Sequence, residues 1–348
     1  MSEQVRAALA AVVGGRRLSI EEARSAMGSV MDGEASPAQL AALLVALRMR
    51  GETVEELAGF AAAMRERVVP VSAPEGAIDT CGTGGDASNT FNISTAAALV
   101  VAAAGVPVAK HGNRAVTSAC GSADVLEALG IATDLSPAEA ARALRTEGFA
   151  FLFAPDYHPA MKHAGPTRRE IGVRTAFNLL GPITNPAGAR RQVVGVGDPA
   201  AAPKLAEVLR LLGSEHALVV HGNDVDELPL DGSGVLYDVT PAGVTRCEIV
   251  AADLGLTPAP LADLSGGAPA ENAAHVEAVL AGRAGPRRDV VLLNAAAALL
   301  AAGRVTGLGD GITIAATTID SGAAASLLER LRAGKAVRDA AKMEVAPA

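Results

Sequence analysis

The apolar positions of the first part of the chain follow a helical period. Through residues 1–67 they recur every three to four positions, as in residues 40–47, and so predict amphipathic helices with one stripe free for packing. Helix starts are marked by capping-box spacing at Ser19 and Thr53 and by a serine–proline pair at Ser36. The sequence therefore predicts a small all-helical N-terminal domain.

Beyond residues 68–76, which contain two prolines and a glycine and are a candidate hinge, short apolar runs alternate with helix-length segments. The predicted strands cover residues 77–81, 106–109, 149–153, 193–196 and 217–220, and the predicted helices include 93–104, 137–147 and 199–212. A hairpin is predicted at 236–240 and 244–249, and long Ala/Leu helices near 295–302 and 323–331. This order predicts an α/β fold, with a large domain built on a mostly parallel, helix-flanked sheet.

Composition narrows the classes of function. The chain has 348 residues, of which 50% are hydrophobic and 20% charged, as expected for a globular protein. Thirty basic and 38 acidic side chains give a net charge of −8, and two Tyr, six Phe and no Trp leave few rings for base stacking. Both features disfavour a nucleic-acid-binding surface and favour a small ligand.

The cysteines and the apolar runs bear on the compartment. Cys81, Cys120 and Cys247 are odd in number and lie outside any C-x-x-C spacing, so neither a disulfide framework nor a zinc site is indicated. No run reaches about 18 uninterrupted apolar residues, and the N-terminus lacks a signal-peptide pattern. A soluble, cytoplasmic protein with reduced thiols and no membrane partner is expected.

A glycine-rich loop is the densest chemical signal. The string DTCGTGGD at 79–86 leaves a predicted strand, and NTFNIST at 89–95 leads into a helix. Such a loop lets backbone N–H groups approach a phosphate at a helix N-terminus, although a tight turn explains three glycines about as well. The hydroxyl and amide groups of 90–95 favour phosphate, and Asp86 beside an anion implies a cation or a ribose hydroxyl nearby.

A second loop follows the next predicted strand. The string KHGNRAVTS at 110–118, with GSAD at 121–124, places two cations, a glycine and several hydroxyls where a second phosphate could bind at the carboxyl ends of parallel strands. A surface loop would explain the charges but not the repeated order of strand, glycine, hydroxyl and helix. For Ser118 and Ser122, helix capping is the simpler alternative.

These strings carry a resemblance to a known family. With DYHP at 156–159, GPTRR at 165–169, NLLGP at 178–182 and HGNDVDE at 221–227, the chain resembles the anthranilate phosphoribosyltransferase family, of the nucleoside phosphorylase-like transferase fold, over nearly its whole length. The resemblance implies that phosphoribosyl pyrophosphate and anthranilate react to give N-(5-phosphoribosyl)anthranilate and pyrophosphate in tryptophan biosynthesis. It also implies Mg²⁺, expected as two ions bound with the pyrophosphate, and a homodimer.

The resemblance also assigns candidate site residues. Those for phosphoribosyl pyrophosphate are Gly82, Gly85, Asp86, Thr90, Asn92, Ile93, Ser94, Thr95, Lys110, His111, Gly112, Asn113, Arg114, Ala115, Val116, Thr117, Ser118 and Ser122. Those for anthranilate are Gly82, Asn113 and Arg168, with His111 and His158 nearby. Ser94, Asp226 and Glu227 match the magnesium-associated positions. Ala115 and Thr117 stand where many members carry serine, which bears on donor affinity.

Residue chemistry supports part of this assignment. Asp226 and Glu227 follow an apolar strand and offer hard oxygen ligands to a Mg²⁺ already bound to phosphate, the alternative being an acidic surface loop. Arg168 has a planar fork suited to an aromatic carboxylate, the alternative being a surface salt bridge on its helix. Histidines such as His158 and His163 are, individually, more often structural than catalytic.

The expected mechanism uses positioning and leaving-group stabilisation, with no dedicated catalytic acid or base. The helical domain, residues 1–70 completed by about 165–190, is expected to close over the α/β donor-binding domain, residues 71–348, and to exclude water. Two other functions remain open. A pyrimidine nucleoside phosphorylase shares the implied fold but is longer and has other loop strings, and a nucleic-acid-binding relative conflicts with the acidic charge.

Overall fold

The computed structural model describes residues 1–84, 88–115, 119–223 and 225–345, with side chains to residue 342. The helices are α1 (Glu3–Val13), α2 (Ile20–Met31), α3 (Pro37–Arg50), α4 (Val54–Arg65), α5 (Ile93–Ala103), α6 (Ser122–Ala128), α7 (Pro137–Thr146), α8 (Ala154–Tyr157), α9 (Gly165–Ile171), α10 (Phe177–Leu180), α11 (Ala202–Leu211), α12 (Pro269–Leu280), α13 (Pro286–Ala301), α14 (Leu308–Asp320) and α15 (Ala323–Val345). The strands are β1 (Ile78–Gly82), β2 (Val108–Gly112), β3 (Phe149–Phe153), β4 (Arg191–Gly195), β5 (His216–Gly222), β6 (Gly234–Thr240) and β7 (Gly243–Ile249). Short 3-10 turns cover Pro159–His163, Gly181–Ile183, Ala251–Leu254 and Leu261–Leu264.

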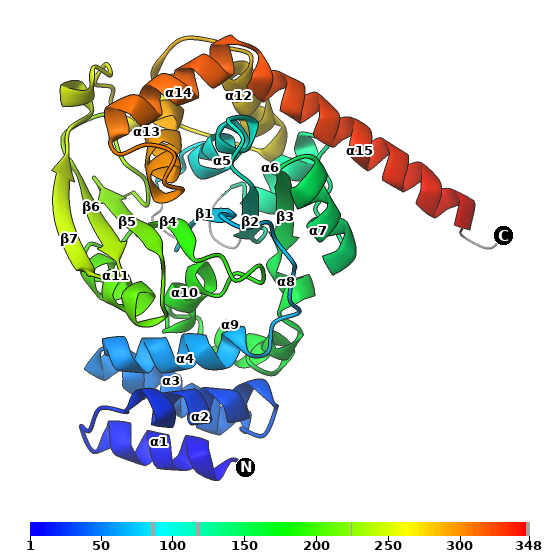
Figure 1. The fold of residues 1–348 in the computed structure, drawn as a ribbon. Coiled ribbons are helices and arrows are strands. Elements are labelled where there is room, and N and C mark those ends of the chain that lie inside the picture. Colours follow the sequence, from blue (N-terminus) through cyan, green and yellow to red (C-terminus); the bar gives the residue numbers. More distant parts are fainter. Residues whose placement is uncertain (85–87, 116–118, 224, 346–348) are drawn as a thin grey trace.

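Helices α2, α3 and α4 begin where the sequence predicts. The hydroxyls of Ser19, Ser36 and Thr53 each accept the backbone N–H three residues on, and each closes a full capping box. These contacts satisfy N–H groups that a helix start otherwise leaves unpaired. Helices α1 to α4 form the helical layer at the N-terminal end of the molecule (Figure 1).

Within the described residues the sheet has seven strands in the order β3-β2-β1-β4-β5-β6-β7. The first five are parallel, whereas β6 and β7 form the antiparallel hairpin that the sequence predicts. The chain passes from β1 through α5 to β2 on one side and later adds β4 on the other side of β1 (Figure 1). The predicted α/β class is thereby confirmed.

Helices cover both faces of the sheet, and strand residues alternate between them. Val193 and Leu218 belong to a hydrophobic cluster with α5 and α13, whereas Val194 and Val219 belong to a cluster with α4 and α11. A strand buried on both faces reads as an uninterrupted apolar run, which is why the sequence shows short solid runs there.

The segment between the helical layer and the sheet is bonded along its length. The N–H of Val69 donates to the carbonyl of Tyr157 (2.8 Å), and the N–H of Val71 donates to the carbonyl of Pro186 (3.1 Å). The hydrophobic cluster of α1 to α4 also includes Phe177 and Leu180. Residues 157–186 are therefore packed with the predicted hinge and with the helical layer together.

Two further predictions concern the cysteines and the membrane. Cys81, Cys120 and Cys247 are all free thiols, the first two of them buried. Over the described residues, no single helix has both the length and the apolarity to cross a membrane; only the bent pair Leu308–Asp320 and Ala323–Lys342, taken together, meets those two criteria.

Candidate active site

Four neighbouring parallel strands end in glycine at one edge of the sheet: Gly82, Gly112, Gly195 and Gly222. A Cβ atom on Gly82 would collide with the Oδ2 of Asp226, and one on Gly195 would collide with the Asp226 carbonyl oxygen. A Cβ atom on Gly112 would likewise overlap Ser122 Oγ. The glycines are required here because later loops cross directly over the strand ends.

The predicted magnesium carboxylates lie over this edge. Asp226 Oδ2 accepts the N–H of Gly84 (3.0 Å), and Glu227 Oε1 accepts the N–H of Ser94 (3.0 Å) in the first turn of α5. Backbone N–H groups at this loop and helix terminus are the donors that the sequence assigns to phosphate. In this structure, carboxylates from the loop after β5 occupy two of those donors.

The residues present fit a divalent ion that arrives with a phosphate. Asp226, Glu227 and the hydroxyl of Ser94 supply hard oxygen ligands around the α5 N-terminus, as Mg²⁺ requires. Among the residues that the structure describes, no group of three or more His, Cys, Asp or Glu side chains is arranged to hold a metal by itself. Waters and phosphate oxygens would complete the coordination of such an ion.

Lys110 lies beneath the same helix terminus. Its Nζ donates to the carbonyl of Thr80 (2.5 Å) and to Ser94 Oγ (3.5 Å), and the side chain is only 2% exposed. Burial lowers the pKa of the Lys110 ammonium, which the charge of nearby Asp79 opposes. Burial also raises the pKa of Asp79, whose Oδ1 accepts the His111 N–H (3.1 Å). The Nζ of Lys110 thus lies under the α5 N-terminus, between Thr80 and Ser94.

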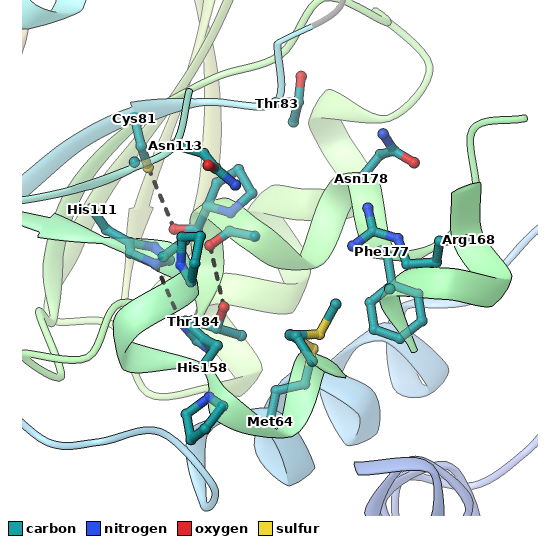
Figure 2. Close-up of a pocket in the computed structure, with 18 of the residues that line it drawn as sticks. Met64, Cys81, Thr83, His111, Asn113, His158, Arg168, Phe177, Asn178 and Thr184 are labelled. Carbon is teal, nitrogen blue, oxygen red and sulfur yellow. Dashed lines mark hydrogen bonds between the residues drawn. The ribbon is translucent and has the colours of Figure 1, made fainter. Parts of the chain in front are cut away.

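A cavity of about 570 Å³ opens between this edge and the helices of residues 154–184. Gly82, His111, Asn113, His158 and Arg168, the residues predicted to contact anthranilate, all line it. Figure 2 shows Arg168 and Phe177 on the opposite side of the cavity from His111 and His158, with Met64 of α4 also contributing. The structure therefore brings this predicted set together from four separate segments.

Arg168 is held by an aromatic ring. Its guanidinium carbon lies 4.7 Å from the ring centroid of Phe177, within cation–π range. Burial lowers the pKa of Arg168, but an arginine remains protonated near neutral pH. The contact places the guanidinium at the cavity wall, where its fork can meet a planar carboxylate.

His111 and His158 form a buried pair. Their Nε2 atoms are 3.2 Å apart and their ring centroids 5.0 Å apart. Burial lowers the pKa of His111 to about 3 and that of His158 to about 4. Both rings are neutral near pH 7, and their tautomers determine which nitrogen of each ring carries its proton. A neutral pair can orient a ligand but cannot supply a positive charge.

Asp124 holds the second predicted loop together. Its Oδ2 accepts the N–H groups of Ala115 and Gly121, both at 2.9 Å, and the Ser122 hydroxyl donates to the carbonyl of Asn113 (3.2 Å). Arg114, predicted to bind the donor, is paired here with Asp124 and Glu127. The described residues on either side of 116–118 are thus joined through Asp124, and the Arg114 guanidinium is paired with carboxylates.

Several residues predicted to bind phosphoribosyl pyrophosphate make other contacts in the structure. The side chains of Ile93 and Thr95 are buried at the start of α5, and Thr90 is bridged to Ser265. The Asn92 amide donates to the carbonyl of Cys120 (3.2 Å) and accepts from Asn272 (3.0 Å). These positions can reach a ligand through their backbone more readily than through their side chains. The predicted residues Gly85, Asp86, Val116, Thr117 and Ser118 lie outside the described residues.

Some groups that support the site edge lie outside the motifs that predict the site. Asn272 and Asn294 are buried amides in helices α12 and α13, and each bonds to a segment of the site edge. Asp124 was noticed only as part of a motif. A single buried amide inside an otherwise apolar helix, as at Asn294, is the signal that could have found them, because such a group needs a partner.

Comparison with known families agrees with this geometry. The model described as "Glycosyl transferase family, helical bundle domain" matches residues 6–68, and the one described as "Glycosyl transferase family, a/b domain" matches residues 74–325. A helical bundle domain and an α/β domain, with a cavity at the glycine-ended edge of the parallel sheet, thus define a two-domain glycosyl transferase.

Individual relatives narrow the class. A protein of Symbiobacterium thermophilum named anthranilate phosphoribosyltransferase is 55% identical over 331 residues, which are 94% of this chain and 97% of that one. The crystal structure of the Thermus thermophilus enzyme of that name is 46% identical, with a TM-score of 0.90 over 94% of this chain and 99% of that one. The Saccharomyces cerevisiae enzyme in complex with PRPP and Mg is 26% identical, with a TM-score of 0.88 over 97% and 99%. The chain belongs to the anthranilate phosphoribosyltransferase family.

Proposed function

We infer that this protein transfers the 5-phosphoribosyl group of phosphoribosyl pyrophosphate to the amine of anthranilate, giving N-(5-phosphoribosyl)anthranilate and pyrophosphate in tryptophan biosynthesis. The observation that carries the inference is the cavity, because Gly82, His111, Asn113, His158 and Arg168 converge on it beside the glycine-ended strands. The family membership and the PRPP and Mg bound to the yeast relative support the same reaction.

The acceptor site is proposed to be the wall formed by Arg168 and Phe177. The guanidinium would take the anthranilate carboxylate in a bidentate pair, while the Phe177 ring lies against it. The neutral His111 and His158 pair would bound the other side of the cavity without attracting the carboxylate. Anthranilate would then be held with its amine free to attack.

The donor site is proposed to lie along the strand edge, from the glycine loop to Asn113 and Ser122. Ser94, Asp226 and Glu227 would hold Mg²⁺ together with the pyrophosphate, and two ions are the proposed number. When bound, magnesium stabilises the negative charge of the leaving pyrophosphate. Lys110 and the N–H groups of α5 would hold the same charge from the protein side.

An aromatic amine is neutral at pH 7, so the proposed reaction needs little acid–base catalysis. The rate would come from alignment of the two substrates and from exclusion of water, which competes as a nucleophile. Residues 1–70, completed by about 165–190, are proposed as the closing domain and residues 71–348 as the catalytic domain. Phe177 and Leu180 share a hydrophobic cluster with α1 to α4, which supports grouping residues 165–190 with the helical layer.

We further propose a homodimer in the cytoplasm. Three large apolar side chains, Val13, Met49 and Val173, are 72%, 83% and 58% exposed on α1, α3 and the turn after α9. Helix α3 packs against both α1 and α9, so these side chains can contribute to one apolar surface. The free thiols of Cys81, Cys120 and Cys247 suit a reducing compartment.

The deciding experiment follows the fluorescence of anthranilate with the protein, phosphoribosyl pyrophosphate and Mg²⁺. Fluorescence is expected to fall only when all three are present. Persistent fluorescence in the complete mixture, or equal turnover of thymidine or uridine with phosphate, would overturn the assignment. A salt-dependent shift with single-stranded DNA would instead favour a nucleic-acid-binding role.

A further inference from the structure

Asn294 is a buried amide in the most apolar part of α13. Its side chain is 4% exposed, and residues 290–293 and 295–299 around it are all buried and apolar. A polar group in such a place costs free energy unless its hydrogen bonds are made. The hydrogen-bond partners of Asn294 therefore indicate why a polar side chain stands at this position.

The partners of Asn294 lie on the loop that follows β5. Its Oδ1 accepts the N–H of Leu228 (3.0 Å), and its Nδ2 donates to the carbonyl of Leu228 (3.0 Å) and to that of Val290 (3.0 Å). One side chain thus satisfies both main-chain polar groups of Leu228, in the way that a neighbouring strand would. The Leu228 side chain is itself fully buried in the cluster that contains α13.

Leu228 directly follows the two carboxylates of the site edge. The Asp226 carboxylate accepts the N–H of Gly84, and the Glu227 carboxylate accepts the N–H of Ser94, both at 3.0 Å. Glu227, Asn294 and Ser94 also line one small cavity of about 10 Å³, at most the size of a water molecule. Asn294 therefore sits immediately behind the carboxylates, while the substrate-sized cavity has no contact with it.

We propose that Asn294 is a positioning residue for the divalent ion: its amide fixes the main chain at Leu228, and so fixes the height of Asp226 and Glu227 above the glycine loop and α5. The inference rests on the proposed metal role of those carboxylates. Groups that orient metal ligands from behind typically change metal affinity about 10- to 100-fold when removed. Loss of the Asn294 amide thus weakens ion binding while leaving the acceptor wall intact.

The test compares three variants of α13 in the full-length protein. Asn294→Leu keeps the branched shape of the side chain and removes both bonds to Leu228, whereas Asn294→Asp keeps the oxygen that accepts the Leu228 N–H. Leu293→Ala is the matched control, because it removes a fully buried side chain from the same helix without touching the amide. If Asn294→Leu does not fold, Asn294→Asp is compared with Leu293→Ala in its place.

The first readout needs no metal. Hydrogen exchange of peptides spanning residues 225–230, measured without Mg²⁺, is expected to accelerate at least tenfold in Asn294→Leu relative to Leu293→Ala at equal global stability. The second readout is Mn²⁺ binding with inorganic pyrophosphate, followed by electron paramagnetic resonance. It is expected to weaken about 10- to 100-fold in Asn294→Leu, less in Asn294→Asp, and not in Leu293→Ala.

Unchanged exchange at 225–230, or equal Mn²⁺ affinity in Asn294→Leu and Leu293→Ala, would overturn the positioning role. Glu227→Gln separates this failure from failure of the metal site. If Glu227→Gln weakens Mn²⁺ binding and Asn294→Leu does not, the metal site stands and Asn294 is only structural. If neither variant weakens Mn²⁺ binding, the metal role of the carboxylates fails, and with it the inference.

Discussion

The Arg168 guanidinium lies over the ring of Phe177, 4.7 Å from its centroid, at the wall of the cavity between the sheet edge and the helices. Arg168 is on α9 and Phe177 begins α10, so the turn between these short helices sets the stacking. An arginine fixed in this way loses less side-chain entropy when it binds a carboxylate than a free one does. In the proposed acceptor site, this pair would orient the carboxylate of anthranilate.

Replacing Arg168 with Ala is expected to raise the KM for anthranilate about 10- to 100-fold, with a much smaller change in the KM for phosphoribosyl pyrophosphate. The magnitude corresponds to loss of a hydrogen-bonded charge pair worth about 1.5–3 kcal/mol. Steady-state kinetics with each substrate varied in turn would measure it, with Arg142→Ala on the surface of α7 as a control. An equal rise in both KM values would remove Arg168 from the acceptor site.

The buried histidine pair predicts how stability depends on pH. The pKa is lowered to about 3 for His111 and about 4 for His158, whereas an unfolded histidine titrates near 6.5. Between these values the unfolded state binds more protons, so the free energy of unfolding falls as pH decreases below about 6.5. Above that pH both states are neutral and the pair adds no slope.

Each ring contributes up to about 1.4 kcal/mol per pH unit to this decline. The free energy of unfolding, measured with urea, is therefore expected to fall less from pH 7 to pH 5 in His158→Gln than in the wild type. The difference between the two decreases is expected to reach up to about 2 kcal/mol. Equal losses in the two proteins would show that His158 takes up its proton equally easily in both states.

The carboxylates of the site edge predict the magnesium dependence. The double variant Asp226→Ala, Glu227→Asn removes both from their positions beside Gly84 and Ser94. Mg²⁺ activation curves are expected to move to at least tenfold higher concentration, because the remaining ligands come from phosphate and Ser94. Wild-type titration and turnover in the double variant would show that the metal assignment is wrong.

The close contact at the end of β4 predicts a large effect of one methyl group. In Gly195→Ala the new Cβ would collide with the carbonyl oxygen of Asp226, so the acidic segment must move. Loss of about 1–3 kcal/mol in stability is expected, together with weaker magnesium activation. Gly309→Ala, where no atom lies within 4 Å, is the control and is expected to change stability by less than about 1 kcal/mol. Thermal unfolding would compare them, and equal stability of the two variants would contradict the crowding.

The exposed apolar side chains of α1 and α3 predict the oligomeric state. Met49 is 83% exposed, and Met49→Glu is expected to shift the protein from dimer to monomer in light scattering at micromolar concentration, because a charge would be desolvated at the contact. Leu211→Glu, at a 42% exposed position on α11, is expected to leave the mass unchanged. A monomeric wild type, or a dimeric Met49→Glu, would contradict an interface at α3.

Local features of the sequence determined most of the fold. Capping residues such as Ser19, Ser36 and Thr53 act within one helical turn, and strands buried on both faces appear as short apolar runs, so both can be predicted without knowledge of distant contacts. The order of strands and helices then left a parallel sheet with a terminal hairpin as the simple solution. The glycine and KHGN loops were recognisable because their residues are adjacent in the chain.

Only the tertiary structure decided which side chains meet. His111 and His158 lie 47 residues apart and Asn294 lies 66 residues from Leu228, yet each pair forms hydrogen bonds. Asn92 was predicted from its motif to bind phosphoribosyl pyrophosphate. Its side-chain amide instead forms hydrogen bonds with Cys120 and Asn272. Such contacts depend on how helices pack on the sheet, which no local propensity specifies. The sequence therefore determined the elements and the chemistry available, whereas packing selected the groups that form the site.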